Sequence, residues 1–134
     1  MNIYISGVWD LLHIGHLNIL EGAKKLGGNL IVGICTDELV PTYKNHKSII
    51  PYKERKRLVS ALRCVDKVIP HASLDEVEML DKYNIDIVVV NSKWGKLPEQ
   101  KVRKRYIEKT GRKLVVLPYT ETISTTEIIE KIKE

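Results

Sequence analysis

The stretch NIYISGVWDLLHIGH, residues 2–16, combines the features that decide the fold. The segment of residues 2–6 is short, mainly apolar and rich in β-branched side chains, which is typical of a strand buried on both faces of a parallel sheet. Gly7 follows directly, and a helical pattern of apolar positions begins at Gly15. A strand, a glycine and a helix in this order predict a phosphate site, because the first N–H groups of a helix and the positive end of its dipole favour anions.

The same alternation of strand-like and helix-like segments continues along all 134 residues. It predicts strands at residues 2–6, 30–35, 67–70, 85–90 and 113–117, and helices at residues 15–26, 52–63, 74–83, 98–109 and 125–133. Ser73 and Ser124 each precede a glutamate by three residues, as in a capping box, and Gly27, Gly28 and Gly111 stand where helices should end. We therefore expect one α/β domain over residues 1–134, with a Rossmann-like, doubly wound, five-stranded parallel sheet and helices on both faces. In such sheets the ligand binds at the carboxyl ends of the strands.

Composition excludes several classes of protein. No apolar run approaches the roughly 18 residues that cross a bilayer, and the N-terminus lacks the features of a secretory signal, so we expect a cytoplasmic protein with no membrane partner. Cys35 and Cys64 form no CxxC pair and favour small core side chains over a disulfide or zinc site. The net charge of +5 comes from scattered basic residues without a recognition motif, so we expect no nucleic-acid partner. The densest basic run, residues 101–105, is interpreted as an exposed helix face.

His13 and His16 are three positions apart and can share one side of the first helical turn. Gly15 between them leaves space for a base or a ribose, and imidazoles donate hydrogen bonds to phosphate oxygens, more strongly when protonated. Two other interpretations remain open. The pair could be polar cap residues, or metal ligands, although no further cluster of His, Cys or carboxylates completes a metal site.

His13-Ile14-Gly15-His16 resembles the HxGH signature of the HIGH nucleotidyltransferase superfamily, and residues 7–13, GVWDLLH, resemble the GTFDLLH segment of its cytidylyltransferase branch. Residues 26–38, 55–70 and 123–126 also resemble the glycerol-3-phosphate cytidylyltransferases of that branch, so the resemblance runs almost from end to end. It implies transfer of a nucleoside monophosphate from an NTP to a small phosphorylated acceptor, with release of pyrophosphate. The leading substrates are CTP and glycerol 3-phosphate, and Mg²⁺ or another divalent cation, held mainly by phosphates, is the expected cofactor.

The resemblance also implies roles for individual residues. His13, His16, Lys44 and Ser124 would be catalytic, with the histidines stabilising charge at the reacting phosphorus. Lys44 and Lys47 would clamp phosphates of the NTP and acceptor, and Asp10 would order its loop or help to place the metal ion. The implied nucleotide-binding residues are Gly7, Val8, Trp9, Asp10, Gly15, Arg63, Asn91, Lys93, Trp94, Tyr119, Ile123, Thr125 and Thr126.

Each of these residues also has a simpler interpretation. Ser124 and Thr125 would suit a helix start for capping alone, and the two lysines could be solvated loop charges. Arg63 could pair with Asp66, and Asp10 could be a turn residue that bonds the backbone two residues on.

Three departures from the branch leave the substrate open. Lys93 replaces an acidic residue near the base, Tyr119 replaces a phosphate-binding arginine, and Trp9 replaces a phenylalanine. Lysine cannot accept a hydrogen bond from an exocyclic amino group. Alternative functions are an adenylyltransferase for a sugar phosphate or flavin precursor, and a catalytically silent nucleotide-binding module. The resemblance further implies a homodimer with residues 63–66 near its interface.

Overall fold

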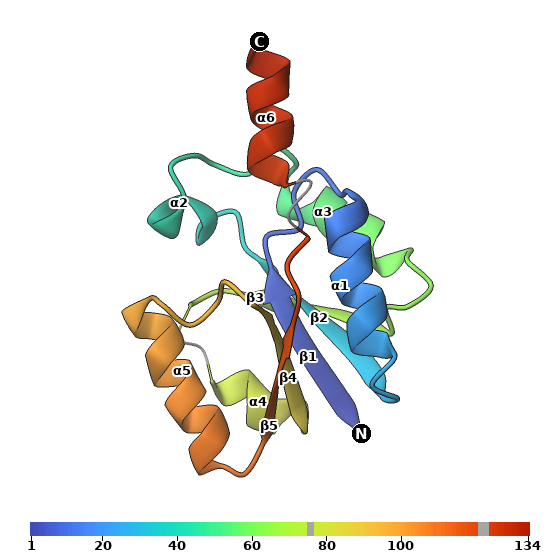
Figure 1. Ribbon diagram of the computed structural model, residues 1–134, viewed down its shortest axis with the longest axis vertical. Coiled ribbons are helices and arrows are strands. Elements are labelled where there is room, and N and C mark those ends of the chain that lie inside the picture. Colours follow the sequence, from blue (N-terminus) through green and yellow to red (C-terminus); the bar gives the residue numbers. More distant parts are fainter. Residues whose placement is uncertain (75–76, 121–123) are drawn as a thin grey trace.

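The computed structural model describes residues 1–74, 77–120 and 124–134 of the chain. Strands and helices alternate along it (Figure 1) in the order β1 (Asn2–Gly7), α1 (Ile14–Lys24), β2 (Asn29–Cys35), α2 (Val40–Tyr43), α3 (Tyr52–Ser60), β3 (Lys67–His71), α4 (Glu78–Lys82), β4 (Ile87–Asn91), α5 (Pro98–Lys109), β5 (Lys113–Leu117) and α6 (Thr125–Lys133). Among the described residues, no helix is long and apolar enough to cross a membrane.

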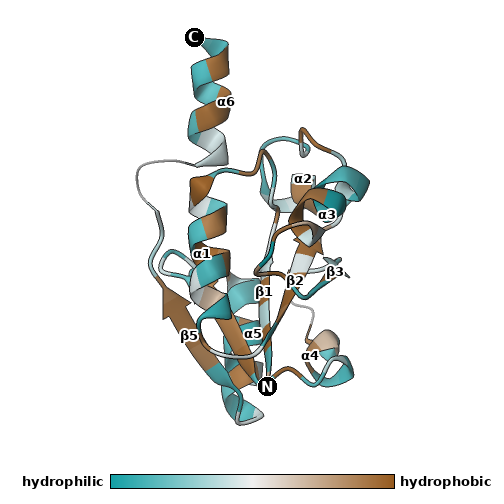
Figure 2. Cartoon of the chain, turned by 90° about the vertical axis from the view of Figure 1, so that its right-hand side faces the viewer, coloured by the Kyte–Doolittle hydropathy of each residue, from teal (hydrophilic) through white to brown (hydrophobic). Residues whose placement is uncertain are grey.

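The five strands form one parallel sheet in the order β3-β2-β1-β4-β5. Helices α1 and α3 lie on one face of it and α4 and α5 on the other (Figure 1). Each face carries its own apolar cluster, one built around Ile3, Ile5, Leu20 and Val32, the other around Tyr4, Leu80, Val88 and Ile107. Strands β2 and β5 are mainly hydrophobic (Figure 2). The predicted doubly wound α/β fold is confirmed.

The winding direction reverses between β1 and β4, since the chain builds β1, β2 and β3 outward in one direction and then returns to add β4 and β5 on the other side. Crevices form at the carboxyl ends of strands where the order reverses. This point of the sheet, at the ends of β1 and β4, is where the site is expected.

Some sequence-based boundaries differ from the structure. The short helix α2 was not predicted, and α4 begins at Glu78 rather than at residue 74, with Val77 at its N-cap. The capping box predicted at Ser73 includes Glu76, which lies outside the described residues. The predicted cap at Ser124 is confirmed, because the Ser124 hydroxyl accepts a hydrogen bond from the N–H of Glu127 at 3.1 Å. Gly27 and Gly111 take the left-handed backbone conformation that ends helices, with φ of 94° and 76°.

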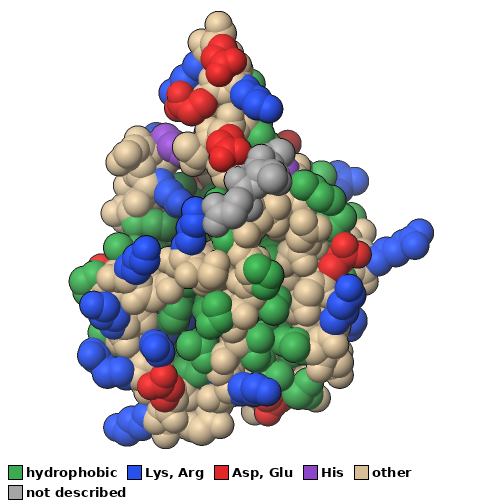
Figure 3. Space-filling model, viewed as in Figure 1, with side chains coloured by type: hydrophobic (Ala, Val, Ile, Leu, Met, Phe, Trp, Pro, Cys, Tyr) green, Lys and Arg blue, Asp and Glu red, His purple; other side chains and the backbone are tan. Residues whose placement is uncertain are grey.

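Both cysteines are free thiols that pack with the core, as predicted. Cys35 is buried, and Cys64 is half-buried against the cluster that lies between the sheet and α1. Lys and Arg side chains are spread over the face shown in Figure 3 rather than gathered in one patch.

Candidate active site

A cavity of about 340 Å³ opens at the carboxyl ends of β1 and β4, where the sheet order reverses. Its floor includes Ile5, Ser6 and Gly7 of β1 and Val88–Asn91 of β4. Its walls come from the starts of α1 and α6, the α2 region and α5. The volume lies in the range of small-molecule sites. Segments from the beginning and the end of the chain therefore meet around one pocket.

The turn between β1 and α1 is held in an unusual conformation. Trp9 and Leu11 have positive φ, 58° and 48°, which costs a non-glycine residue roughly 1–3 kcal/mol and persists only where the surroundings impose it. The buried Trp9 indole donates a hydrogen bond to the Gly33 carbonyl at 3.0 Å. The buried Asp10 carboxylate accepts the N–H groups of Ile49 and Ile50, at 2.7 and 2.9 Å. Asp10 thus orders the loop that contains Ile49 and Ile50, which was one of its two predicted roles. It is not a local turn residue, because these partners are about 40 positions away in the sequence.

The two histidines of this turn are held by their own backbone. His13 is the N-cap of α1, and its Nδ1 accepts the N–H of Gly15 at 3.0 Å, while Nδ1 of His16 accepts the N–H of His13 at 3.2 Å. A backbone N–H can only donate, so both Nδ1 atoms are unprotonated and each neutral ring carries its proton on Nε2. The rings stack with centroids 3.9 Å apart. The cap and phosphate interpretations are thus compatible, because Nδ1 caps the helix and Nε2–H remains a donor.

The electrostatics of the pair favour neutral rings. Burial, with a smaller contribution from the charge of His13, lowers the pKa of His16 to about 3. Burial also lowers the pKa of His13, and Glu127 at the start of α6 opposes that shift. Protonation would require Nδ1 to give up its backbone hydrogen bond. At neutral pH the histidines are therefore neutral hydrogen-bond donors rather than cations.

The start of α6 lies beside the start of α1. The Thr125 hydroxyl donates to the carbonyl of Asp10 at 2.8 Å, and Asn18 of α1 contacts the Thr120 hydroxyl at 3.4 Å. Ser124 and Thr125 line the same cavity as His13 and His16. We name these four residues the histidine end of the cavity. Two helix N-termini therefore converge there, an arrangement suited to a polyphosphate.

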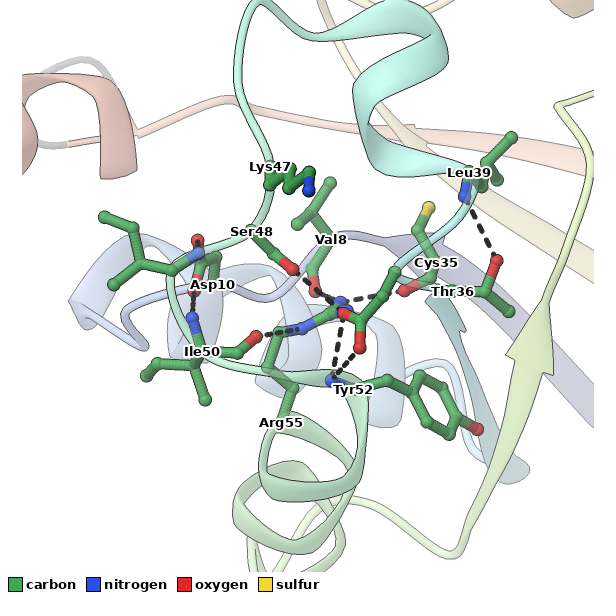
Figure 4. A network of polar contacts seen from close by, with 12 residues as sticks. Val8, Asp10, Cys35, Thr36, Leu39, Lys47, Ser48, Ile50, Tyr52 and Arg55 are labelled. Atoms are coloured by element: carbon green, nitrogen blue, oxygen red, sulfur yellow. Dashed lines mark hydrogen bonds and ion pairs between the residues drawn. The ribbon is translucent and has the colours of Figure 1, made fainter.

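The basic loop that carries Lys44 is anchored through Arg55 and Asp37. Arg55 has no exposed surface, and it donates to the carbonyls of Val8, Cys35 and Ile50 at 2.7–2.8 Å and to the Asp37 carboxylate at 2.6 Å (Figure 4).

Asp37 also accepts hydrogen bonds from the Ser48 hydroxyl and the Tyr52 N–H, each at 3.0 Å. Burial opposes its ionisation, but the hydrogen bonds from Tyr52, Arg55 and Ser48 outweigh that effect and lower its pKa. The Asp37–Arg55 pair thus joins the ends of β1 and β2 to the loop.

Neither residue of this pair was predicted as part of the site. The sequence could have indicated both. Asp37 follows the end of β2, where ligands bind, and Arg55 lies four positions before buried Val59 and so shares its helix face.

A second charged group lies at the other end of the cavity. Arg103 of α5 is 3% exposed, and its Nη1 donates to the Ser6 hydroxyl at 3.2 Å. Its guanidinium lies over the ring of Tyr4, 5.4 Å from the centroid, and the Tyr4 hydroxyl bonds Nδ1 of His71 at 2.8 Å. We name the cavity-lining residues Ser6, His71, Gln100 and Arg103 the arginine end.

Residues 101–105 were predicted to be one exposed helix face, and for Arg103 this is wrong. Lys101, Lys104 and Arg105 are exposed, but Arg103 shares the buried face of α5 with Ile107 four positions on. The four-residue spacing from Ile107 predicts a buried position for Arg103, but the neighbouring basic residues suggested an exposed one.

Most of the predicted site residues line the cavity: Gly7, Val8, Trp9, Asp10, His13, Gly15, His16, Lys44, Asn91, Trp94, Tyr119, Ser124, Thr125 and Thr126. Lys47 and Arg63 are exposed and are not among the residues that line it, and Asp66 pairs with Lys24 at 2.7 Å instead of Arg63. Lys93 is also outside the lining, with its Nζ 4.2 Å from the ring centroid of Tyr119. Ile123 lies outside the described residues.

A family model described as cytidylyltransferase-like matches residues 4–131. The chain belongs to the cytidylyltransferase-like family. It is similar to glycerol-3-phosphate cytidylyltransferase of Bacillus subtilis (strain 168), with 39% identity over 94% of this chain and 92% of that protein. It is also similar to ethanolamine-phosphate cytidylyltransferase of Arabidopsis thaliana, with 31% identity over 98% of this chain, which spans 32% of that longer protein.

A similar solved structure is the lipopolysaccharide core biosynthesis protein of Thermoplasma volcanium GSS1, with a TM-score of 0.74 and 25% identity over 92% of this chain and 98% of that one. Fold and family agree. The protein is a nucleotidyltransferase.

Proposed function

We propose that this nucleotidyltransferase transfers CMP from CTP to the phosphate of a small acceptor and releases pyrophosphate. Two relatives whose names state a cytidylyl transfer differ in the acceptor they name, glycerol 3-phosphate in one and ethanolamine phosphate in the other. The nucleotide is therefore the common element. Glycerol 3-phosphate is the leading acceptor, because the relative that names it is 39% identical.

The observation that carries the proposal is the convergence of the starts of α1 and α6 on one cavity with His13 and His16. In the proposed reaction an oxygen of the acceptor phosphate attacks the α-phosphorus of CTP in line, and the bond from that phosphorus to the bridging oxygen of pyrophosphate breaks. Such transfers need positioning and charge stabilisation rather than a protein nucleophile. The Nε2–H groups of the histidines, the N–H groups at Ser124 and Thr125 and the charge of Lys44 would supply them.

A divalent cation such as Mg²⁺ belongs to the proposal, since it would offset the negative charge of the phosphates. In the part of the chain that the structure describes, no three His, Cys, Asp or Glu side chains gather to hold a metal. Both oxygens of Asp10 accept backbone N–H groups. These side chains fit a cation that would be held mainly by the phosphates, and Asp10 is the one carboxylate among the described residues of the lining.

The test is a matrix of CTP, ATP, GTP and UTP against glycerol 3-phosphate and other phosphorylated acceptors, with Mg²⁺ and with pyrophosphate release as the readout. We expect turnover with CTP at least tenfold above that with ATP. Faster turnover with ATP would favour an adenylyltransferase for a sugar phosphate or flavin precursor. Nucleotide binding without pyrophosphate from any pair would indicate a silent binding module.

We also propose that the protein acts as a cytoplasmic homodimer on small molecules rather than on nucleic acid. The proposal follows from the resemblance to the cytidylyltransferase branch. Light scattering would test the dimer, with a mass near twice the 15.4 kDa of one chain as the expected result.

A further inference from the structure

His71 is a buried polar side chain to which the proposed transfer assigns no role. It ends β3, is 2% exposed and lines the cavity at the arginine end. Its Nδ1 is hydrogen-bonded to the Tyr4 hydroxyl at 2.8 Å. Its Nε2 has no hydrogen-bond partner among residues 1–74, 77–120 and 124–134, but it is not fully enclosed, so it opens on the cavity. Buried polar atoms are normally paired, and the partner of Nε2 is therefore expected to be a group bound in the cavity.

The sheet fixes this imidazole in place. The main-chain carbonyl of His71 accepts the N–H of Thr36 at 3.1 Å. Tyr4 is fully buried, and Gly33 leaves room for its hydroxyl, which a Cβ at that position would overlap. Burial, with a contribution from the charge of Arg103, lowers the pKa of His71 to about 3, so the ring is neutral at neutral pH. A neutral ring held at Nδ1 presents one polar atom to the cavity, Nε2.

The sheet divides the lining of the cavity into two sides. Trp94 and Tyr119 follow β4 and β5, and both were predicted to bind the nucleotide. Tyr43 and Leu74 follow β2 and β3, and with His71 they line the side beyond β1. A nucleotide whose phosphates lie at the starts of α1 and α6 and whose base lies near β4 and β5 leaves the β2–β3 side for the acceptor.

The lining on the β2–β3 side suits a short, neutral carbon chain that carries a phosphate. Cys35, Val40 and Leu74 belong to one apolar cluster. The Tyr43 hydroxyl is paired with the Cys35 thiol at 3.4 Å. Lys44 directly follows Tyr43 and supplies a positive charge for the acceptor phosphate. A hydroxyl can both donate and accept, so it pairs with Nε2 in either tautomer of the ring, whereas an ammonium only donates and a carboxylate only accepts.

We propose that His71 is a specificity-determining residue, whose Nε2 forms a hydrogen bond with a hydroxyl group of the phosphorylated acceptor. This inference rests on the proposed transfer of CMP and assigns one contact to its acceptor. Bond making and breaking are unchanged: the acceptor phosphate oxygen bonds to the α-phosphorus, and pyrophosphate leaves with the electron pair of the broken bond. The acceptor hydroxyl and His71 keep their own protons throughout.

The experiment compares glycerol 3-phosphate with propyl phosphate, which has the same carbon chain and phosphate but no hydroxyl group. With CTP and Mg²⁺, kcat/KM of the parent enzyme should be higher for glycerol 3-phosphate by about tenfold or more, because propyl phosphate leaves Nε2 without a partner. Propane-1,2-diol 1-phosphate and propane-1,3-diol phosphate each keep one of the two hydroxyls. One of them should retain the advantage over propyl phosphate and the other should lose it, whereas equal behaviour of both would contradict a single contact.

A double variant removes the contact with little damage to the fold. In Tyr4→Phe/His71→Leu both partners of the buried hydrogen bond become apolar, a change that costs far less stability than removing one partner. The preference for glycerol 3-phosphate over propyl phosphate should fall to less than about threefold, through a lower kcat/KM for glycerol 3-phosphate. The KM for CTP should stay the same. His71→Gln keeps a donor and an acceptor, so it should retain part of the preference, and it is the second variant if the first does not fold.

His46→Gln is the matched control. His46 also lines the cavity, but it is exposed, and its Nδ1 contacts the carbonyl of Lys47 at 2.8 Å. This substitution should leave the preference between the two acceptors unchanged.

Three results would contradict the contact. Equal kcat/KM for glycerol 3-phosphate and propyl phosphate in the parent enzyme would exclude a hydroxyl subsite. An equal loss for both acceptors in Tyr4→Phe/His71→Leu and in His71→Gln would make His71 a purely structural residue. A raised KM for CTP with an unchanged acceptor preference would place His71 beside the nucleotide.

Calorimetric titration separates this inference from the proposed function, because it needs no turnover. Glycerol 3-phosphate and propyl phosphate are titrated into the parent enzyme and into Tyr4→Phe/His71→Leu, alone and with a CTP analogue that has a methylene bridge between its α- and β-phosphates. Tighter binding of glycerol 3-phosphate that depends on His71 would support the contact even if no nucleotide gave pyrophosphate. Binding of both compounds with equal strength would contradict the contact even if CMP transfer were efficient.

Discussion

The two imidazoles of the histidine end and the side chains of the arginine end are held in place in different ways. At the histidine end, His16 is bonded to His13 three positions away, and His13 to Gly15 two positions away. At the arginine end, Arg103 is bonded to Ser6 across 97 positions, and His71 to Tyr4 across 67. Local hydrogen bonds form with their helix, whereas the distant ones require the complete sheet. The first arrangement therefore depends on the start of α1 alone, and the second depends on the assembled sheet and α5.

Loss of the His16 imidazole should produce the largest effect. His16→Ala should lower kcat by about 10²- to 10³-fold, the usual consequence of removing one donor to a charge that develops in the transition state. His16→Asn keeps an acceptor near the position of Nδ1, and His16→Gln keeps a donor near the position of Nε2. If Nε2–H is the active group, His16→Gln should retain more activity than His16→Asn in the same pyrophosphate assay.

Circular dichroism and thermal melting check that these variants fold. Full activity of His16→Ala would remove His16 from the mechanism. Better activity of His16→Asn than of His16→Gln would mean that the contact with the His13 N–H matters more than the donor.

Removal of Arg55 tests the distant contacts most strongly. Arg55→Met should lower the free energy of unfolding by about 2–4 kcal/mol, because three carbonyls and Asp37 lose a charged donor. The estimate is below that for a fully buried ion pair, since the Asp37 side chain is 43% exposed. Urea denaturation measures the change, and Arg57→Met, which removes an exposed arginine from α3, is the control. A loss no larger than that of Arg57→Met would show that the loop is held by other contacts.

A pair of glycine substitutions should separate the two ends. A Cβ on Gly15 would lie 2.8 Å from Cε1 of His13, so Gly15→Ala should displace the imidazole and lower activity with little loss of stability. A Cβ on Gly33 would overlap the Tyr4 hydroxyl, so Gly33→Ala should cost about 1–3 kcal/mol of stability. Tyr4→Phe in the Gly33→Ala background should recover part of that loss. Equal effects of both substitutions on activity and melting would contradict the separation.

Lowering the pH should reduce the free energy of unfolding, by less per pH unit than the substitutions above. The pKa values of His16 and His71 are lowered to about 3 in the folded chain, whereas an unfolded histidine titrates near pH 6.5. Between these values the unfolded state binds more protons, so stability is complete above about pH 6.5 and falls as the pH decreases toward about 3.

Each group contributes a slope of at most about 1.4 kcal/mol per pH unit. Urea denaturation at about pH 7 and about pH 5 should therefore show a smaller difference for His71→Gln than for the parent chain. An identical pH dependence would mean that folding does not lower the pKa of His71.

The contrast between the ends also explains what could be predicted from sequence. The pair His13 and His16, the cap at Ser124 and the order of strands and helices depend on neighbours and on periodicity, and these were found. Arg103 and Arg55 were missed as site residues because each stands in a basic helix and is buried only by partners brought together by folding. The helix α2 has four residues, too few for a periodic signal.

The last helix gives the site a further property. No residue of α6 is fully buried, Ile132 near its end is 75% exposed, and the helix projects beyond the sheet (Figure 1). Its described attachments are at its first turn, at the place where phosphates would bind. A nucleotide that bridges the first turns of α1 and α6 would therefore stabilise the docking of the whole helix by mass action. Amide exchange along α6 should therefore slow as the CTP concentration rises, and its rate would report the fraction of the protein that has nucleotide bound.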